Sequence, residues 1–191
     1  IGANVGWFTL QMAALGVQVV AIEPMDANLH LIRRSLCLEA NKAFADRVFV
    51  FGNGLGTEKQ TCVMISGDDN IGDGHTLCVP EGEDVAARVQ IGYGIRSKIE
   101  VERLDDILSL EKRTVVAVKM DTEGYEAHVV EGGRNFFLKS KISHIFTEYA
   151  PLAMMIGKGG NGTAFMSSFL DAGYQLRMHD TADGQYRTRK D

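Results

Sequence analysis

The chain has 191 residues, of which 45% are hydrophobic and 24% are charged, a composition typical of a globular protein with a sizeable core. A formal net charge of −5 gives no overall attraction to nucleic acid or to an anionic membrane. No apolar run approaches the roughly 18 residues needed to span a bilayer. We therefore expect a single domain over residues 1–191, with neither a nucleic-acid partner nor a membrane span.

The first 24 residues predict the end of a strand, a glycine turn, a helix and a second strand. Gly2 and Gly6 flank the turn, and glycine both tolerates positive φ and lacks a Cβ, so a ligand can lie against this backbone. The first free N–H groups of the following helix point to the same place. Because Ile1 holds the position of a strand's last residue, we expect a truncated first strand and a natural amino terminus upstream.

Val17–Ile22 is an apolar run broken only by Gln18, which is typical of a strand buried in a parallel sheet. Glu23 and Pro24 follow it at the carboxyl end, where open α/β sheets bind ligands. A carboxylate there can accept hydrogen bonds from two ribose hydroxyls, so the stretch predicts a nucleoside site. The alternative is a glycine turn that only packs the helix on the sheet, with Glu23 as a solvated strand end.

The glycine spacing distinguishes two kinds of nucleoside site. A dinucleotide loop has the pattern Gly-x-Gly-x-x-Gly, whose middle glycine makes room for a pyrophosphate. Here Asn4 and Val5 stand before Gly6, and the pattern is Gly-x-x-x-Gly. That spacing looks like the S-adenosylmethionine loop of class I methyltransferases.

Helical and strand patterns alternate along the first 51 residues. Trp7–Leu15 predicts a helix with an apolar face, and Trp7 is interpreted as a core residue, with a cofactor contact as the alternative. Residues 27–40 predict a second helix with a buried stripe, and Arg47–Phe51 a further strand. The apolar positions are Val5, Phe8, Met12 and Leu15 for the first helix and Leu29, Ile32 and Leu36 for the second. This alternation predicts an α/β fold with a doubly wound, mostly parallel sheet.

The segment after the third strand contains Asn53 and Gly54, which either form the floor under a purine or turn the chain into the next strand. Residues 57–102 are interpreted as an insertion near the mouth of the site that can contact substrate. Within it, Thr61–Ile65 and Ile99–Glu102 predict a pair of strands, and Ser66–Asp84 predicts a loop.

Three cysteines, Cys37, Cys62 and Cys78, have no metal-ligand spacing. Cys37 falls in a helical pattern and Cys62 in a strand pattern. We expect buried free thiols rather than disulfides, which favours a reducing, cytoplasmic location, and we assign no metal site.

A second chemical stretch, Val115–Gly133, predicts a strand followed by a glycine turn and a helix. Asp121 and Glu123 fall at the strand's carboxyl end, on the same edge as Gly2 and Glu23. Two carboxylates in a cleft are costly unless they are hydrogen-bonded, paired or used in catalysis. They could accept a proton from a hydroxyl, hold an ammonium or hold a cation, or they could only satisfy free N–H groups at a helix start. Glu148 follows the next strand as a further acid on this edge.

Several stretches in this order resemble the FkbM-type family of S-adenosylmethionine-dependent methyltransferases. The stretches are Ile1–Thr9, Ala21–Pro24 followed by Asn28, Leu104–Asp106, Val118–Glu126 and Glu148. The resemblance covers nearly the whole chain, although the middle region fits loosely. The family pattern also has an acidic residue just before the position of Ile1, which this sequence does not include.

The resemblance implies a Rossmann-like class I methyltransferase fold and methyl transfer, most often to a hydroxyl oxygen. It implies that Gly2, Asn4, Gly6 and Glu23 hold the cofactor, while Asp121 and Glu123 face the methyl group and the acceptor. With Val5, Pro24, Asn53 and Gly54 added from their positions, these residues form the predicted cofactor site, and Glu148 is assigned to substrate. We expect O-methylation of a small hydroxylated metabolite or a sugar. The alternatives are a non-catalytic nucleoside-binding module and an NAD-dependent oxidoreductase.

Overall fold

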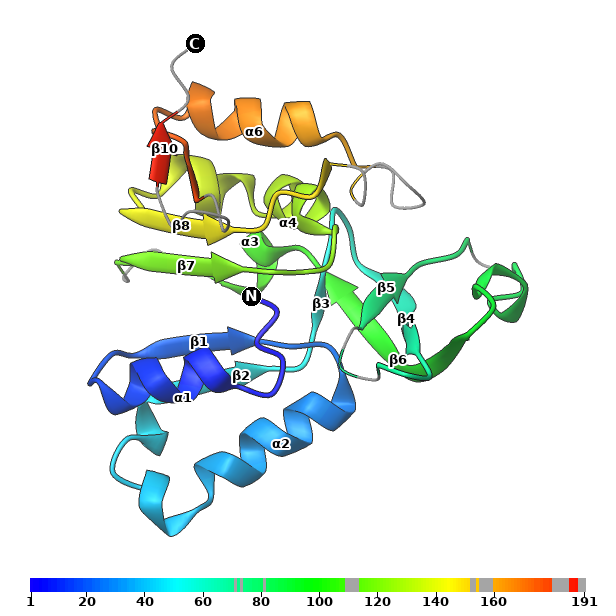
Figure 1. Cartoon of the computed structure of the whole chain (residues 1–191), viewed down its shortest axis with the longest axis horizontal. Coiled ribbons are helices and arrows are strands. Elements are labelled where there is room, and N and C mark those ends of the chain that lie inside the picture. Colours follow the sequence, from blue (N-terminus) through cyan, green and yellow to red (C-terminus); the bar gives the residue numbers. More distant parts are fainter. Residues whose placement is uncertain are drawn as a thin grey trace.

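A computed structural model describes residues 1–70, 72, 74–80, 82–108, 114–151, 154, 160–179 and 186–188 (Figure 1). The helices are α1 (Trp7–Ala14), α2 (Asp26–Leu36), α3 (Leu104–Ile107), α4 (Glu126–Gly132) and α6 (Gly162–Asp171), with short 3-10 turns at Glu39–Asn41, Ala45–Arg47 and Ala86–Arg88 and a π-helical turn at Asn135–Lys139. The strands are β1 (Val19–Ile22), β2 (Val48–Phe51), β3 (Gly54–Leu55), β4 (Gln60–Gly67), β5 (His75–Leu77), β6 (Tyr93–Glu102), β7 (Ala117–Met120), β8 (His144–Thr147), β9 (Arg177–His179) and β10 (Tyr186–Thr188).

Two pairs of parallel strands form the centre of the molecule. β1 pairs with β2, with Val19 opposite Val48, and β7 pairs with β8, with Ala117 opposite His144. Residues 1–3 lie between the pairs, where the amino terminus is marked in Figure 1. The Ile1 nitrogen donates to the Lys119 carbonyl at 2.9 Å, and the Gly2 N–H donates to the Ile22 carbonyl at 3.0 Å. These residues therefore join the two pairs at the place expected for the first strand.

The expected doubly wound parallel sheet is present only in part, because the middle of the chain forms a mixed sheet of its own. Its strand order is β3-β6-β4-β5, and only the short β3–β6 pairing is parallel. The predicted pairing is confirmed, with Thr61 opposite Glu100. β5 falls within Ser66–Asp84, which was expected to be a loop. Strands joined without crossover helices can pair antiparallel, and this sheet projects to one side of the parallel strands in Figure 1.

The main core packs β1, β3 and β7 against α3, α4, α6 and the π-helical turn. Phe137 is fully buried and meets Phe136 and Phe169 edge-on, at ring-centroid distances of 5.0 and 6.2 Å. Asp105, in the first turn of α3, accepts hydrogen bonds from the backbone N–H groups of Asn135 and Phe136. Its carboxylate therefore fixes the start of the turn that carries these aromatic rings.

The apolar face of α1 is exposed, which contradicts the core position assigned to Trp7. Trp7 is 67% exposed and Leu15 75%, and Val5, Phe8 and Met12 are exposed as well. The buried residues of this helix are Thr9 and Ala13, four positions apart. Because these side chains are small, α1 lies close to β1 on that side and its large apolar side chains point away. In α2, by contrast, Leu29 and Ile32 are buried as predicted.

The expectation of buried free thiols is wrong for all three cysteines. Cys62 and Cys78 form a disulfide, and Cys37, immediately after α2, is an exposed free thiol. The pairing follows from β4 and β5 being neighbours in the mixed sheet, a contact that sequence spacing does not reveal. The thiol argument for a reducing compartment therefore fails, since structural disulfides persist mainly in oxidising ones. Among the helices described, none has the length and apolarity to cross a membrane.

Candidate cofactor site and acidic edge

The two glycines of the first loop are required for different contacts. Gly2 has φ of 68°, and a Cβ there would lie 1.8 Å from the Asp121 carbonyl oxygen. Gly6 has φ of 88°, and its Cβ would lie 2.9 Å from the Ile32 side chain. Gly2 therefore lets the loop approach the tip of β7, whereas Gly6 lets α1 approach α2. At Gly6 the glycine serves the packing of a helix, here on α2, and Gly6 does not line the cavity described below.

Glu23 ties the end of β1 to this loop. Its Oε2 accepts from the Asn4 N–H at 2.8 Å, and its Oε1 accepts from the Met25 N–H at 3.0 Å and the Asn28 amide at 3.3 Å. The residue is 5% exposed, so it is no solvated strand end. Burial raises the pKa of the Glu23 carboxyl above its usual value, and these three hydrogen bonds oppose the rise.

Asn4 holds the loop in the conformation that Glu23 requires. Its φ is 50°, in the left-handed region that asparagine tolerates better than most residues. Its side-chain oxygen accepts from the Val5 N–H at 2.7 Å. The backbone N–H of Asn4 is thus aimed at Glu23 by local geometry that the residue itself stabilises.

A cavity of about 340 Å³ lies over the carboxyl ends of the parallel strands. This is within the usual range for small-molecule sites, about 300–1,000 Å³. The structure brings most of the predicted site residues to its wall: Gly2, Asn4, Val5, Glu23, Pro24, Asn53, Gly54, Asp121 and Glu123. Gly6 and Glu148 are not among the lining residues. Asn53 and Gly54 line the cavity, the position expected for a floor under a purine. Gly54 also begins β3, so the segment turns the chain into the next strand as well.

Asp121 lies at the edge of this cavity in contact with a lysine. Lys119 Nζ is 2.9 Å from Asp121 Oδ2, and the same ammonium lies 5.5 Å from the centre of the Phe8 ring. Lys119 lies in β7, two residues before Asp121, and the ion pair forms at the carboxyl end of this strand. Glu123 follows with φ of 53° and Gly124 with 86°. A non-glycine residue in the left-handed region is strained, and such strain is concentrated at functional sites.

Glu126, the first residue of α4, was not predicted as a site residue and is fully buried. Its Oε1 accepts from both the N–H and the hydroxyl of Thr122, at 2.7 and 2.9 Å. Within the described part of the chain, its Oε2 has no hydrogen-bond partner. Carboxylate oxygens of Asp121, Glu126 and the exposed Glu148 lie within 4.8 Å of one another, and we call these three residues the acidic cluster.

Sequence reasoning also missed the wall contributed by the mixed sheet. Met64 of β4, Thr76 of β5 and Gly74 before it line the cavity, as do Trp7 and Tyr125. Residues 57–102 were expected near the mouth, but no pattern indicated which of them would face it. For Tyr125, and for Lys119, the available signal was their closeness in sequence to the predicted site residue Asp121.

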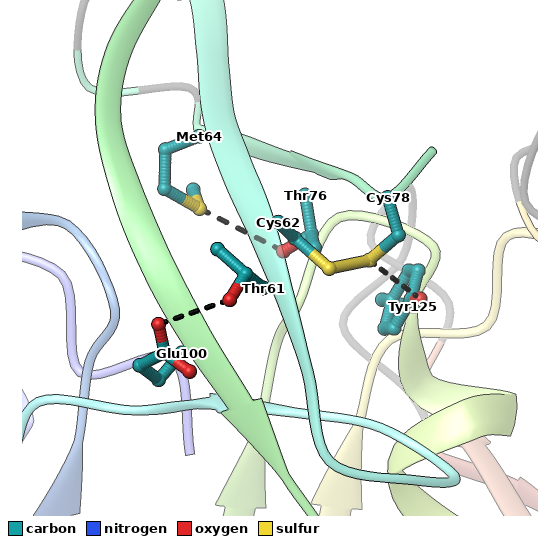
Figure 2. The surroundings of a disulfide bond; sticks show 7 residues. All are labelled: Thr61, Cys62, Met64, Thr76, Cys78, Glu100 and Tyr125. Carbon is teal, nitrogen blue, oxygen red and sulfur yellow. Dashed lines mark hydrogen bonds between the residues drawn. A yellow bond between two sulfur atoms is a disulfide. The ribbon is translucent and has the colours of Figure 1, made fainter. Parts of the chain in front are cut away.

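The disulfide lies beside this wall (Figure 2). It joins Cys62 of β4 to Cys78, which follows β5, and Cys78 Sγ lies 3.5 Å from the Tyr125 hydroxyl (Figure 2). The Thr76 hydroxyl donates to Met64 Sδ at 3.7 Å, so two cavity residues are joined directly. The disulfide therefore holds β5 against β4 where both strands reach the cavity.

Comparison with known proteins identifies the family. Residues 1–176 match the model described as the Methyltransferase FkbM domain. The chain belongs to the FkbM methyltransferase family. The resemblance inferred from Ile1–Thr9 and Val118–Glu126 is confirmed by this match, and family membership supports a methyltransferase enzyme.

Two further comparisons add little to the family assignment. The crystal structure of Methyltransferase FkbM from Methylobacillus flagellatus KT at 2.20 Å resolution is 23% identical, with a TM-score of 0.48, and the match covers 74% of this chain. The match covers only 29% of that protein, and at this TM-score the likeness carries no argument. No curated protein matches the sequence.

Proposed function

We propose that this FkbM-family chain binds S-adenosylmethionine in the 340 Å³ cavity and transfers its methyl group to a hydroxyl oxygen. The observation that carries the proposal is the placement of Glu23 and Asp121 on one cavity, with the Gly2–Gly6 loop between them. Glu23 accepts hydrogen bonds from the two ribose hydroxyls, and Gly2, Asn4 and Val5 present backbone to the ligand. Pro24, Asn53 and Gly54 lie where the nucleoside base is expected.

The reaction needs alignment and a basic group more than covalent assistance. The acceptor oxygen attacks the methyl carbon, the carbon–sulfur bond breaks, and the products are the methyl ether and S-adenosylhomocysteine. The hydroxyl proton passes to Asp121, and Glu123 supports that carboxylate from the next turn. Holding the two reactants in line supplies most of the acceleration.

The acceptor is proposed to be a small hydroxylated metabolite or a sugar, contacted by the wall that Met64, Gly72, Gly74 and Thr76 form. Met64 and Thr76 offer an apolar and a hydroxyl contact at that wall. Carboxylates and a threonine hydroxyl accept hydrogen bonds from a polyhydroxylated ligand.

Calorimetry with S-adenosylmethionine and with NAD tests the cofactor. We expect saturable binding of S-adenosylmethionine only. Binding of NAD alone would overturn the proposal in favour of an oxidoreductase.

Transfer from labelled S-adenosylmethionine into a small-molecule extract tests the reaction. We expect labelled product with the parent chain and at least a hundredfold less with Asp121→Asn, because the amide cannot take the proton. Cofactor binding without product from any extract would instead favour a non-catalytic binding module. Unchanged product formation in Asp121→Asn would refute the role of Asp121.

A further inference from the structure

We propose that the acidic cluster, Asp121, Glu126 and Glu148, binds one hard divalent cation at the edge of the cavity. The three residues follow β7, begin α4 and follow β8, and they converge so that one oxygen from each lies within 4.8 Å of the others. Sequence spacing did not indicate this site because its members come from three segments up to 27 residues apart.

The buried Glu126 supplies the independent reason to expect a ligand. It is fully buried, its Oε1 is occupied by Thr122, and its Oε2 has no partner among the residues that the structure describes. A carboxyl oxygen removed from water without a hydrogen-bond partner or a cation is unfavourable. The placement of Asp121 and Glu148 oxygens beside this residue adds negative charge, so the arrangement requires a positive species.

Lys119 is the cation already present, and it does not complete the cluster. Its Nζ contacts Asp121 Oδ2, and no described contact joins it to Glu126. A divalent cation would give Glu126 Oε2 a partner and would contact all three carboxyl groups at once. A proton shared between two carboxyls is the competing solution, and it leaves the third carboxyl outside the contact.

The donor set and its dimensions select the type of cation. All three donors are carboxylate oxygens, which suit Mg²⁺, Ca²⁺ and Mn²⁺ rather than the softer metals. Ca²⁺ binds oxygen at about 2.3–2.6 Å, so two ligands on opposite sides of it are about 4.6–5.2 Å apart. Separations of up to 4.8 Å thus fit a cation of this size as they stand. The smaller Mg²⁺, at about 2.0–2.1 Å, requires the exposed Glu148 and the half-buried Asp121 to move inward.

The cation would share Asp121 with the cavity, because Asp121 lines it and Glu126 and Glu148 do not. A cation there polarises an acceptor hydroxyl next to the group that takes its proton, and this role rests on the proposed function. Binding of the cation itself does not depend on the methyl acceptor.

Titration with Mn²⁺, followed by electron paramagnetic resonance and calorimetry without cofactor or acceptor, tests the site. We expect one saturable site in the parent chain. Glu126→Gln keeps an oxygen for Thr122 but removes the charge, and Glu148→Gln removes the charge of the exposed member of the cluster. Each is expected to weaken Mn²⁺ binding at least tenfold. Glu131→Gln, on the exposed side of the same helix, is the control and should bind as the parent does.

Three outcomes would overturn the inference: no saturable Mn²⁺ binding at millimolar concentration, unchanged binding in Glu148→Gln, or equal weakening in Glu131→Gln. If Glu126→Gln fails to fold, Glu148→Gln decides the result. Methyl transfer without Mn²⁺ binding would refute the cation site and leave the proposed function intact. Mn²⁺ binding without S-adenosylmethionine binding would support the cation site and refute the proposed function.

Discussion

At the scale of single residues, the same residue type has different roles at neighbouring positions of the first loop. Gly2 is needed for close approach to the Asp121 carbonyl, and Gly6 for close packing on Ile32. Gly16, after α1, also has positive φ, of 92°, but a Cβ there would meet nothing within 4 Å. Comparing alanine substitutions at these glycines therefore separates the cost of the backbone conformation from the cost of a steric clash.

Gly2→Ala is expected to lower the free energy of unfolding by more than about 3 kcal/mol, because a Cβ 1.8 Å from a backbone carbonyl adds a clash to the cost of positive φ. Gly16→Ala should lose only about 1 kcal/mol, the cost of the backbone conformation alone. Urea denaturation of both variants measures the difference. Equal losses would mean that the loop does not approach β7 as described.

The buried Glu23 predicts how cofactor affinity depends on pH. Ribose hydroxyls donate to an ionised carboxylate, and burial raises the pKa of Glu23 above 4.5 in the folded chain. Affinity for S-adenosylmethionine should therefore be highest well above that pKa and fall as pH falls through it. Calorimetry from pH 8 down to pH 4, below the usual pKa of a glutamate, measures this change.

Glu23→Gln is the comparison for that titration. Its affinity should be at least about tenfold weaker at pH 8, because hydrogen bonds to a charged acceptor contribute about 1.5–3 kcal/mol each. The same variant should also lose most of the pH dependence. A parent chain with flat affinity over this range would show that Glu23 does not hold the ribose.

At the scale of elements, the sequence predicts those whose burial follows their own periodicity. β1 and α2 form where predicted, although α2 ends four residues earlier, since their apolar residues face the core. The face of α1 was misjudged because Thr9 and Ala13 make the packing contact, and a hydrophobic pattern gives small residues little weight. β5 and the disulfide depend on which strands become neighbours, and local sequence does not encode that.

The residues of the candidate site also divide into those that local sequence predicts and those that depend on which strands become neighbours. Gly2, Asn4, Glu23 and Asp121 were predicted because each lies at a strand end, and parallel strand ends share one edge. Met64 and Thr76 come from an antiparallel sheet, to which no such rule applies.

The disulfide predicts an element-level response to reduction. Cys62 and Cys78 are separated by 16 residues, and a loop of about that length loses about 3 kcal/mol of stabilisation when its bond is broken. Reduction should lower the melting temperature and speed backbone hydrogen exchange in β5, while β7 should be little affected. Cys37→Ser should respond like the parent, whereas Cys62→Ala/Cys78→Ala should not respond to reductant. Equal exchange of β5 in the oxidised and reduced chains would contradict this role.

At the scale of the whole molecule, the cavity joins parts of the chain that are otherwise separate sheets. The loop after residue 1, the ends of β1 and β7, the start of β3 and the β4–β5 wall all contribute to it. A ligand that fills the cavity contacts each of them at once. Binding should therefore stabilise the fold as a unit rather than one element.

S-Adenosylmethionine at 100 times its dissociation constant is expected to add about 2.7 kcal/mol to the free energy of unfolding. For a chain of this size, each kcal/mol raises the melting temperature by about 2–4 °C, so the expected rise is about 5–10 °C. Calorimetric melting with and without ligand measures it, with NAD as the control that should give no rise. Glu23→Gln should show about half that rise at the same ligand concentration, because a tenfold weaker affinity leaves about 1.4 kcal/mol of stabilisation. A rise confined to NAD, or one equally large in Glu23→Gln, would place the ligand elsewhere than between Glu23 and Asp121.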